Sequence, residues 1–433
     1  MLLKRIQLGL VHVAVAMTLV PINSTLNRVM IKELALSAAL VALLASLPYL
    51  FSPIQVAIGA YSDRHPLFGL RRTPYILAGL LLCVIGVAVS PQVAFLLSTN
   101  FPLGILAGLL AFGAWGMGYN LSSVSYLSLA SELSGEKGRG STIAVMWFMM
   151  IVGIILTAMG LSRMVDPYTP AALVRAFGSI AAAALVLGLL GLLWLEPRAR
   201  LTSAPAAEAY SLRRMAGTIA RNPVGRIFFL YLLLLLAAIL GQDILLEPFG
   251  AEAFGMTVTQ TTRITSIWGS FVLLAIALAA FLDRRVPRRV VVQAGNLGAL
   301  AGFLIIFLSG LLHSLPVFYT GVTLLGFGTG IATVSNLSLM FELTIPGEVG
   351  LYIGAWGVSN ALSRLVGSVL GGVLRDAVSR LMGVPLAGYL AVFGIEALML
   401  LAAVFMLAGI NVAAFRRQAA APSFAETVAL AAE

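Results

Sequence analysis

Charged residues are scarce in this chain: Asp, Glu, Lys and Arg make up only 10% of its 433 residues. A soluble globular domain carries about a quarter charged residues, which cover its surface. With 60% hydrophobic residues the chain cannot form such a surface, so a soluble fold is excluded. We predict an all-α membrane protein, because helices satisfy their own backbone hydrogen bonds in lipid.

Cysteine, histidine and aspartate are also scarce. The single cysteine, Cys83, excludes an intramolecular disulfide, and there are three histidines. The five aspartates are isolated from one another: Asp63, Asp166, Asp243, Asp283 and Asp376. No aspartate-rich cluster for a magnesium diphosphate and no G-x4-G-K-[ST] phosphate loop is present. We therefore predict a protein that is not an enzyme and that holds no metal.

Twelve apolar runs are long enough to cross a bilayer. They cover residues 8–30, 34–60, 73–90, 103–131, 140–161, 171–195, 225–247, 260–282, 290–312, 316–341, 349–371 and 386–411. The longest hydrophilic stretch between them, residues 196–222, follows the sixth run. This divides the chain into a first half at 1–195, a linker at 196–222, a second half at 223–411 and a tail at 412–433.

Basic residues are unevenly distributed between the two sets of loops. If the N-terminus is cytoplasmic, the inner segments hold 19 of the 27 Lys and Arg residues and the outer segments hold seven. This excess predicts that both termini are cytoplasmic. The net charge of +10 is then a topology signal, with anionic lipids as expected partners, and nucleic-acid binding is not predicted.

An internal repeat relates the two halves. Residues 116–133 and 326–343 are identical at nine of 18 positions, and they fall in the fourth and the tenth predicted spans. The glycines of these segments, Gly113, Gly116 and Gly118 in one and Gly326, Gly328 and Gly330 in the other, are interpreted as close-packing positions between helices. Two parallel six-helix repeats are typical of the major facilitator fold.

Residues 59–72, "GAYSDRHPLFGLRR", concentrate charge between the second and third spans. The stretch resembles the signature loop of the major facilitator superfamily, although the loop is longer here. The resemblance implies a cytoplasmic latch between the halves, formed by Gly59, Asp63, Arg64, Arg71, Arg72, Glu132, Asp283, Arg284, Glu342 and Glu348.

In this latch, Asp63 would meet backbone amides near Glu348, and Arg64 or Arg71 would pair with Glu132. The second half would mirror the arrangement, with Asp283 at the start of the fifth span and Arg284 near Glu342. A carboxylate at a helix N-terminus is favourable by about 0.3–1 kcal/mol when exposed. The alternative is that this charge only sets the topology.

Four longer segments resemble a narrower family. "LNRVMIKEL" (26–34), "YSDRHPLFGLRRTPYI" (61–76), "ASELSGEKGRG" (130–140) and "GQDILLEPFGAEAFGM" (241–256) are similar to the bacteriochlorophyll-delivery (PucC/LhaA) family. The resemblance implies an assembly factor for light-harvesting antenna complexes in a bacterial photosynthetic intracytoplasmic membrane. Its cargo would be bacteriochlorophyll, and its partners antenna polypeptides, pigment-synthesis enzymes and insertion machinery. A proton-coupled transporter of a small amphipathic solute is one alternative, and a docking scaffold that no longer alternates between conformations is another.

A few polar residues interrupt the apolar spans, where such residues are costly and kept for function. These candidate polar or gating positions are Asn27, Arg28, Asp243, Glu247, Arg364 and Glu396. Arg364 and Glu396 are expected to lie at similar depths and to form an ion pair, with either a structural or a gating role. His12, the only histidine within a span, is a candidate ligand for the pigment's magnesium. A polar residue at the headgroup boundary is the alternative.

Overall fold

The computed structural model describes residues 2–55, 58, 61–62, 65–197, 217, 223–282, 285–343 and 349–410. These residues form helices and turns, with one isolated bridge between Leu67 and Leu70. Within them, eleven helices are long and apolar enough to span a membrane. The prediction of an all-α membrane protein is therefore confirmed.

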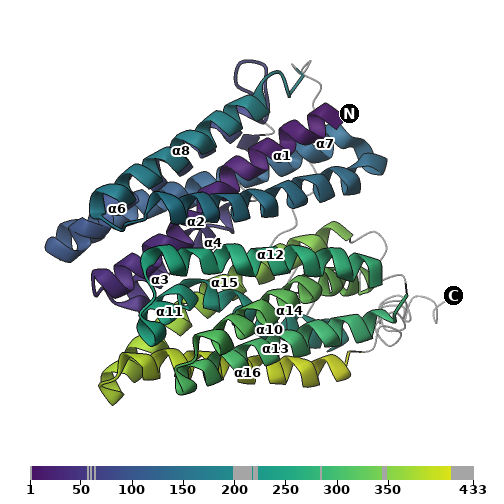
Figure 1. Cartoon of the computed structure of the whole chain (residues 1–433). Coiled ribbons are helices and arrows are strands. Elements are labelled where there is room, and N and C mark those ends of the chain that lie inside the picture. The colour runs from purple at the N-terminus through teal and green to yellow at the C-terminus, as the bar shows by residue number, and fades with distance from the viewer. Residues whose placement is uncertain are drawn as a thin grey trace.

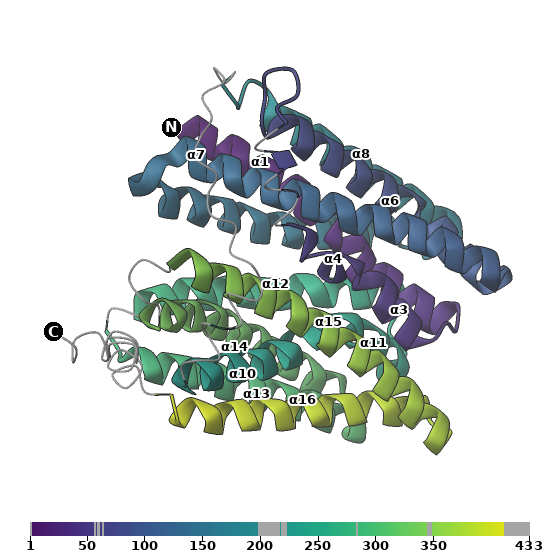
Figure 2. The same ribbon diagram turned by 180° about the vertical axis from the view of Figure 1, so that it is seen from behind.

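The elements form two bundles that lie side by side in Figures 1 and 2. The first bundle contains α1 (Leu2–Met17), α2 (Leu19–Pro21), the π-helices η1 (Ile22–Leu26) and η2 (Val29–Glu33), α3 (Ala38–Ala45), α4 (Leu47–Leu50), α6 (Thr73–Thr99), α7 (Phe101–Met164) and α8 (Pro170–Leu192). Gly135, at φ 63°, turns α7 back on itself, so that α7 supplies two spans, Phe101–Gly135 and Gly138–Met164. Side chains of Asn100 and Thr169 cap the first turns of α7 and α8.

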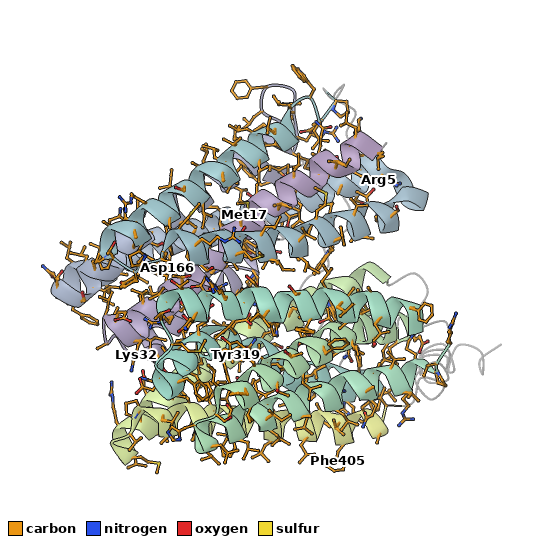
Figure 3. The ribbon with its side chains drawn as sticks, viewed as in Figure 1. Arg5, Met17, Lys32, Asp166, Tyr319 and Phe405 are labelled. Atoms are coloured by element: carbon orange, nitrogen blue, oxygen red, sulfur yellow. The ribbon has the colours of Figure 1, made fainter. Side chains whose placement is uncertain are left out.

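The second bundle contains α10 (Pro223–Gly241), the 3-10 turn η3 (Gln242–Ile244), α11 (Leu246–Phe254), α12 (Val258–Leu282), α13 (Arg288–Leu312), α14 (Leu315–Glu342), α15 (Val349–Met382) and α16 (Pro385–Ala408). α1 begins and α16 ends at the same end of the molecule, which we call the near end (Figures 1 and 2). Arg5 lies there, whereas Lys32 and Asp166 lie at the opposite, distal end (Figure 3).

The predicted spans agree with the helices, except that α10 ends at Gly241 within the span predicted at 225–247 and that the span predicted at 34–60 is interrupted. There the chain is broken into α3 and α4, and residues 56, 57, 59 and 60 lie outside the described part. Pro48 accounts for the break, because its ring clashes with the carbonyl four residues earlier and it lacks an N–H group. The runs predicted at 73–90 and 349–371 continue to Thr99 and Met382. Most of the predicted linker and all of the predicted tail lie outside the described residues.

The two halves use glycine in the same way at equivalent helix crossings. A Cβ atom on Gly118 of α7 would lie 2.5 Å from the carbonyl oxygen of Gly79 in α6, which real side chains do not tolerate. In the second half, a Cβ atom on Gly295 of α13 would lie 2.7 Å from the nitrogen of Ala332 in α14. Both pairs of helices therefore touch backbone to backbone, as expected for small residues in membrane spans.

Candidate functional site

Polar side chains between the two halves form two groups. The central cluster lies part-way along the spans and consists of Tyr49, Gln242, Asp243, Arg364 and Glu396. The distal seal joins the halves at the distal end; its members are Ser24, Thr25, Arg28, Lys32 and Ser37 from the first half and Glu247, Glu252, Thr262 and Asp376 from the second.

The central cluster is built where α10 ends. At Gly241 the chain lies so close to α15 and α16 that an added Cβ atom would be 2.9 Å from Glu396 Oε1 and 3.1 Å from the carbonyl carbon of Gly367. The next residues form the η3 turn, which presents Asp243 to α15. Asp243 Oδ2 accepts a hydrogen bond of 2.7 Å from Arg364 Nη1. Its Oδ1 accepts one of 2.9 Å from Gln242 Nε2, so both carboxylate oxygens are engaged.

Arg364 connects the two halves through its guanidinium group. The guanidinium lies 5.4 Å from the centre of the Tyr49 ring, and Nη1 is 3.5 Å from the Tyr49 hydroxyl. An arginine over an aromatic ring gains electrostatic attraction from the ring face. Even so, the Arg364 side chain remains 31% exposed.

The predicted ion pair between Arg364 and Glu396 is wrong, because Arg364 pairs with Asp243. A similar depth in the membrane does not fix the direction in which a side chain points around its helix. Here the η3 turn brings Asp243 to the arginine, while the Glu396 side chain lies against Gly241. Glu396 is buried, and in the described part of the chain its Oε2 has no hydrogen-bond partner.

The distal seal is centred on irregular turns of the first span. Residues 22–26 and 29–33 form π-helical turns, which occur frequently at functional sites. Between them, Arg28 is buried, binds Glu33 and donates a 3.0 Å hydrogen bond to the carbonyl of Met256 in the second half. Asn27 is also buried; its Nδ2 donates to the Asn23 carbonyl, and its Oδ1 has no partner.

Glu247 is the most enclosed acid of the seal, with 3% of its surface exposed. Its Oε1 accepts hydrogen bonds from Ser24 (2.5 Å) in the first half and Thr265 (2.7 Å) in the second. Its Oε2 is buried and has no hydrogen-bond partner among the residues that the structure describes. Lys32 and Glu252 form an ion pair of 2.5 Å across the same boundary.

A second part of the seal joins α15 to the start of α3. Asp376 Oδ2 accepts a hydrogen bond of 2.7 Å from Ser37 Oγ and one of 3.0 Å from the nitrogen of Ala39. Its Oδ1 accepts from the neighbouring Arg375. A Cβ atom on Gly372 would lie 2.6 Å from the carbonyl oxygen of Ala38, so the two backbones are in contact. The two halves are therefore bonded together at the distal end.

The predicted latch lies partly outside the described residues, which exclude Gly59, Asp63, Arg64, Asp283, Arg284 and Glu348. In the described part, Arg72 pairs with Glu132 at 2.8 Å, and Arg288 pairs with Glu342 at 2.6 Å. Each pair lies within a single half, Arg72–Glu132 in the first and Arg288–Glu342 in the second. Among the described residues, Arg72 and not Arg71 is the partner of Glu132, whereas the other predicted partner, Arg64, lies outside the described residues. Arg288 is the described basic partner of Glu342.

Glu196 holds the backbone beside Arg72 at the start of α6. The Glu196 carboxylate accepts hydrogen bonds from the backbone nitrogens of Arg71 (2.7 Å), Arg72 (3.1 Å) and Thr73 (2.7 Å). This fixes the first turn of α6, as expected for an acid at a helix N-terminus. The sequence analysis missed Glu196, although an acid directly after the sixth span was the available signal.

His12 lies in an aromatic cluster inside the first half. Its ring centre is 5.0 Å from that of Tyr126 and 6.1 Å from that of Trp147. The side chain is only 6% exposed. Among the described residues, its Nδ1 has no hydrogen-bond partner.

Comparison with known families identifies the chain. A family model described as PUCC protein matches residues 25–415. The chain belongs to the PucC family. It is 33% identical to Protein PucC of Rhodovulum sulfidophilum, over 87% of this chain and 85% of that one, and 31% identical to Protein PucC of Rhodobacter capsulatus, over 93% and 90%. A further relative from Rhodobacter capsulatus, named Bacteriochlorophyll synthase 44.5 kDa chain, is 28% identical over 94% and 95%.

Solved transporter structures share the fold of this PucC-family chain. A single-site mutant of the nucleoside transporter NupG has a TM-score of 0.73 at 15% identity, over 94% of this chain and 99% of that one. A bacterial homologue of the lysosomal transporter Spinster has a TM-score of 0.73 at 13% identity, over 97% and 98%. At such low identity the likeness shows the fold alone. The prediction of a major facilitator fold is confirmed, and the chain is a multi-pass membrane protein.

Proposed function

We propose that this PucC-family protein is a non-catalytic assembly factor for light-harvesting antenna complexes. It binds bacteriochlorophyll and delivers the pigment to antenna polypeptides in the photosynthetic intracytoplasmic membrane of a bacterium. Pigment-synthesis enzymes, insertion machinery and anionic lipids are its further partners. Support comes from the family, and from the name of the relative that refers to bacteriochlorophyll.

The observation that carries this proposal is the hydrogen bonding and exposure of the side chains in the central cluster. Bacteriochlorophyll is a large, mainly apolar macrocycle with a few polar substituents, so a binding region for it needs apolar walls and few polar groups. Among the described central groups, Asp243 binds both Gln242 and Arg364, and Arg364 remains partly exposed. Gln242 Oε1 and Glu396 Oε2 are buried acceptors without a partner among the described residues. One accessible donor between two apolar bundles suits a ligand of this type better than a sugar or a nucleoside.

The same cluster favours binding over catalysis. The carboxylate of Asp243 is occupied by two donors, and the guanidinium of Arg364 carries a permanent charge, so neither group is arranged to move a proton. Although the name of one relative contains the word synthase, we propose no catalytic step for this chain.

An absorption spectrum of the protein tests the proposal. The full-length protein is purified in mild detergent from a bacteriochlorophyll-making host, and the extracted pigment is quantified per chain. We expect near-stoichiometric bacteriochlorophyll and a reduced amount with Arg364→Gln, whereas the exposed-residue control Arg163→Gln retains it. A colourless wild-type protein from a pigment-rich host contradicts pigment binding.

The buried acids favour a second candidate, a proton-coupled transporter of a small amphipathic solute. Glu247 and Glu396 each have one buried oxygen without a hydrogen-bond partner among the described residues. Such an oxygen can accept and release a proton when its surroundings change. Uptake into proteoliposomes driven by a pH gradient, and lost with Glu247→Gln, would support this function. Uptake that is independent of the gradient would oppose it.

A further inference from the structure

The hydrogen-bonding capacity of Arg364 is only partly used. A guanidinium carries five N–H donors in a planar fork. In the described part of the chain, Arg364 uses Nη1 for Asp243 and for a long contact with the Tyr49 hydroxyl, and its Nε and Nη2 have no hydrogen-bond partner. Neither atom is among the buried groups that lack a partner, and the side chain is 31% exposed. Free donors of Arg364 are therefore accessible between the two halves.

The charge of Arg364, in contrast, is already compensated. Asp243 Oδ2 lies 2.7 Å from Arg364 Nη1 and forms an ion pair with it, and Asp243 Oδ1 receives a second hydrogen bond from Gln242. The pair as a whole is neutral but still offers N–H donors. Glu396 is the remaining acid of the central cluster, and any negative charge on it adds to that of Asp243.

We propose that Arg364 and Asp243 select a neutral pigment that carries carbonyl acceptors and reject its free-acid form. This proposal rests on the pigment-binding function proposed above. A keto or ester oxygen accepts the free N–H groups of Arg364 without adding net charge. A carboxylate adds a negative charge beside a guanidinium that Asp243 already neutralises, and an uncompensated charge away from water is costly.

The proposal also places the protein in a reaction sequence. Bacteriochlorophyll differs from its free acid by esterification of one carboxyl group with a long-chain alcohol. A site that rejects the free acid acts after this esterification. The reaction class that supplies the ligand is therefore alkyl transfer to the pigment's carboxylate, and the protein receives the product of that step.

A pair of matched probes tests the charge argument. The long alkyl tail would itself increase affinity, so the probes are bacteriochlorophyllide and its methyl ester, which share one macrocycle. Each is titrated into the full-length protein in nanodiscs, and binding is followed by the shift of the pigment's absorption band. We expect wild-type protein to bind the methyl ester about tenfold or more tightly than the acid, the scale of one uncompensated charge.

Substitution of Asp243 gives the decisive result. Asp243→Asn keeps the shape of the side chain but leaves the charge of Arg364 uncompensated. We expect the ratio of ester affinity to acid affinity to fall about tenfold or to invert, because the acid now supplies the missing negative charge. Arg364→Gln weakens both probes and increases the preference for the ester, because the charge of Asp243 is then uncompensated, whereas Arg364→Lys keeps the charge and the wild-type preference.

Two control variants and two further outcomes complete the test. Asp166→Asn and Arg163→Gln change exposed residues at the distal end and are expected to leave the ratio at the wild-type value. If the probes bind but the Asp243 and Arg364 variants keep the wild-type ratio, the selection by Arg364 and Asp243 is overturned while pigment binding stands. If neither probe binds the wild-type protein, both proposals are overturned.

Discussion

Asp376 provides a direct test of the distal seal. Its Oδ2 holds two groups of the first half, Ser37 Oγ and the nitrogen of Ala39, so Asp376→Ala removes two hydrogen bonds between the halves. A hydrogen bond to a charged group contributes roughly 1.5–3 kcal/mol, and part of this is recovered through water when the end opens. We estimate a loss of about 2–3 kcal/mol for the closed distal end, which corresponds to a roughly 30- to 150-fold rise in the open population.

The assay measures how often the distal end opens. Ala38 is fully buried against Gly372, so a cysteine at position 38 reacts with a maleimide only after the halves separate. The native cysteine is buried and is replaced by serine. We expect the labelling rate of Ala38→Cys to rise by roughly the same factor in Asp376→Ala, since the rate follows the open population when closing is fast.

The control and the refutation use the same reporter. Asp166→Ala removes an exposed aspartate from a distal loop and is expected to leave the labelling rate unchanged. Asp376→Asn retains one carbonyl acceptor and is expected to give an intermediate rate. If Asp376→Ala labels at the wild-type rate, the two hydrogen bonds do not hold the distal end closed, and the role assigned to the seal is incorrect.

Three further predictions concern stability. Glu196→Ala leaves three backbone N–H groups of α6 without their acceptor and is expected to lower the free energy of unfolding by about 1–2 kcal/mol, measured by thermal denaturation in detergent. Gly118→Ala forces α6 and α7 apart and is expected to reduce the yield of folded protein, whereas Gly113→Ala, which meets no atom within 4 Å, leaves the yield unchanged in size-exclusion chromatography. Glu342→Gln weakens a partly exposed ion pair and is expected to change the unfolding free energy by less than about 1 kcal/mol.

The fold could be predicted because it depends on signals carried along the chain. Most of the long apolar runs, and the repeated glycines at Gly118 and Gly328, lie within continuous helices, whereas the motif segments, such as 241–256, cross helix ends and turns. The main incorrect prediction of the fold was the single span at 34–60. Its apolar composition predicted one helix, and the effect of Pro48 on the backbone was not taken into account.

The partners of polar residues could not be predicted in the same way. Depth along a span is fixed by sequence position, but the direction of a side chain depends on how each helix is rotated in the bundle. Arg364 was therefore assigned to Glu396, and the η3 turn that delivers Asp243 has no simple sequence signal. Glu196 and Asp376 bind backbone nitrogens more than 100 residues away, which only the folded chain brings close.

The ion pairs Arg72–Glu132 and Arg288–Glu342 have one more consequence, because each lies within a single half. A rotation of one half against the other leaves both pairs intact, so they contribute equally to every orientation of the halves. Substitutions there change how much folded protein a cell accumulates. Substitutions in the distal seal change the relative populations of the closed and open forms. Abundance and conformational balance are thus separately adjustable in this chain.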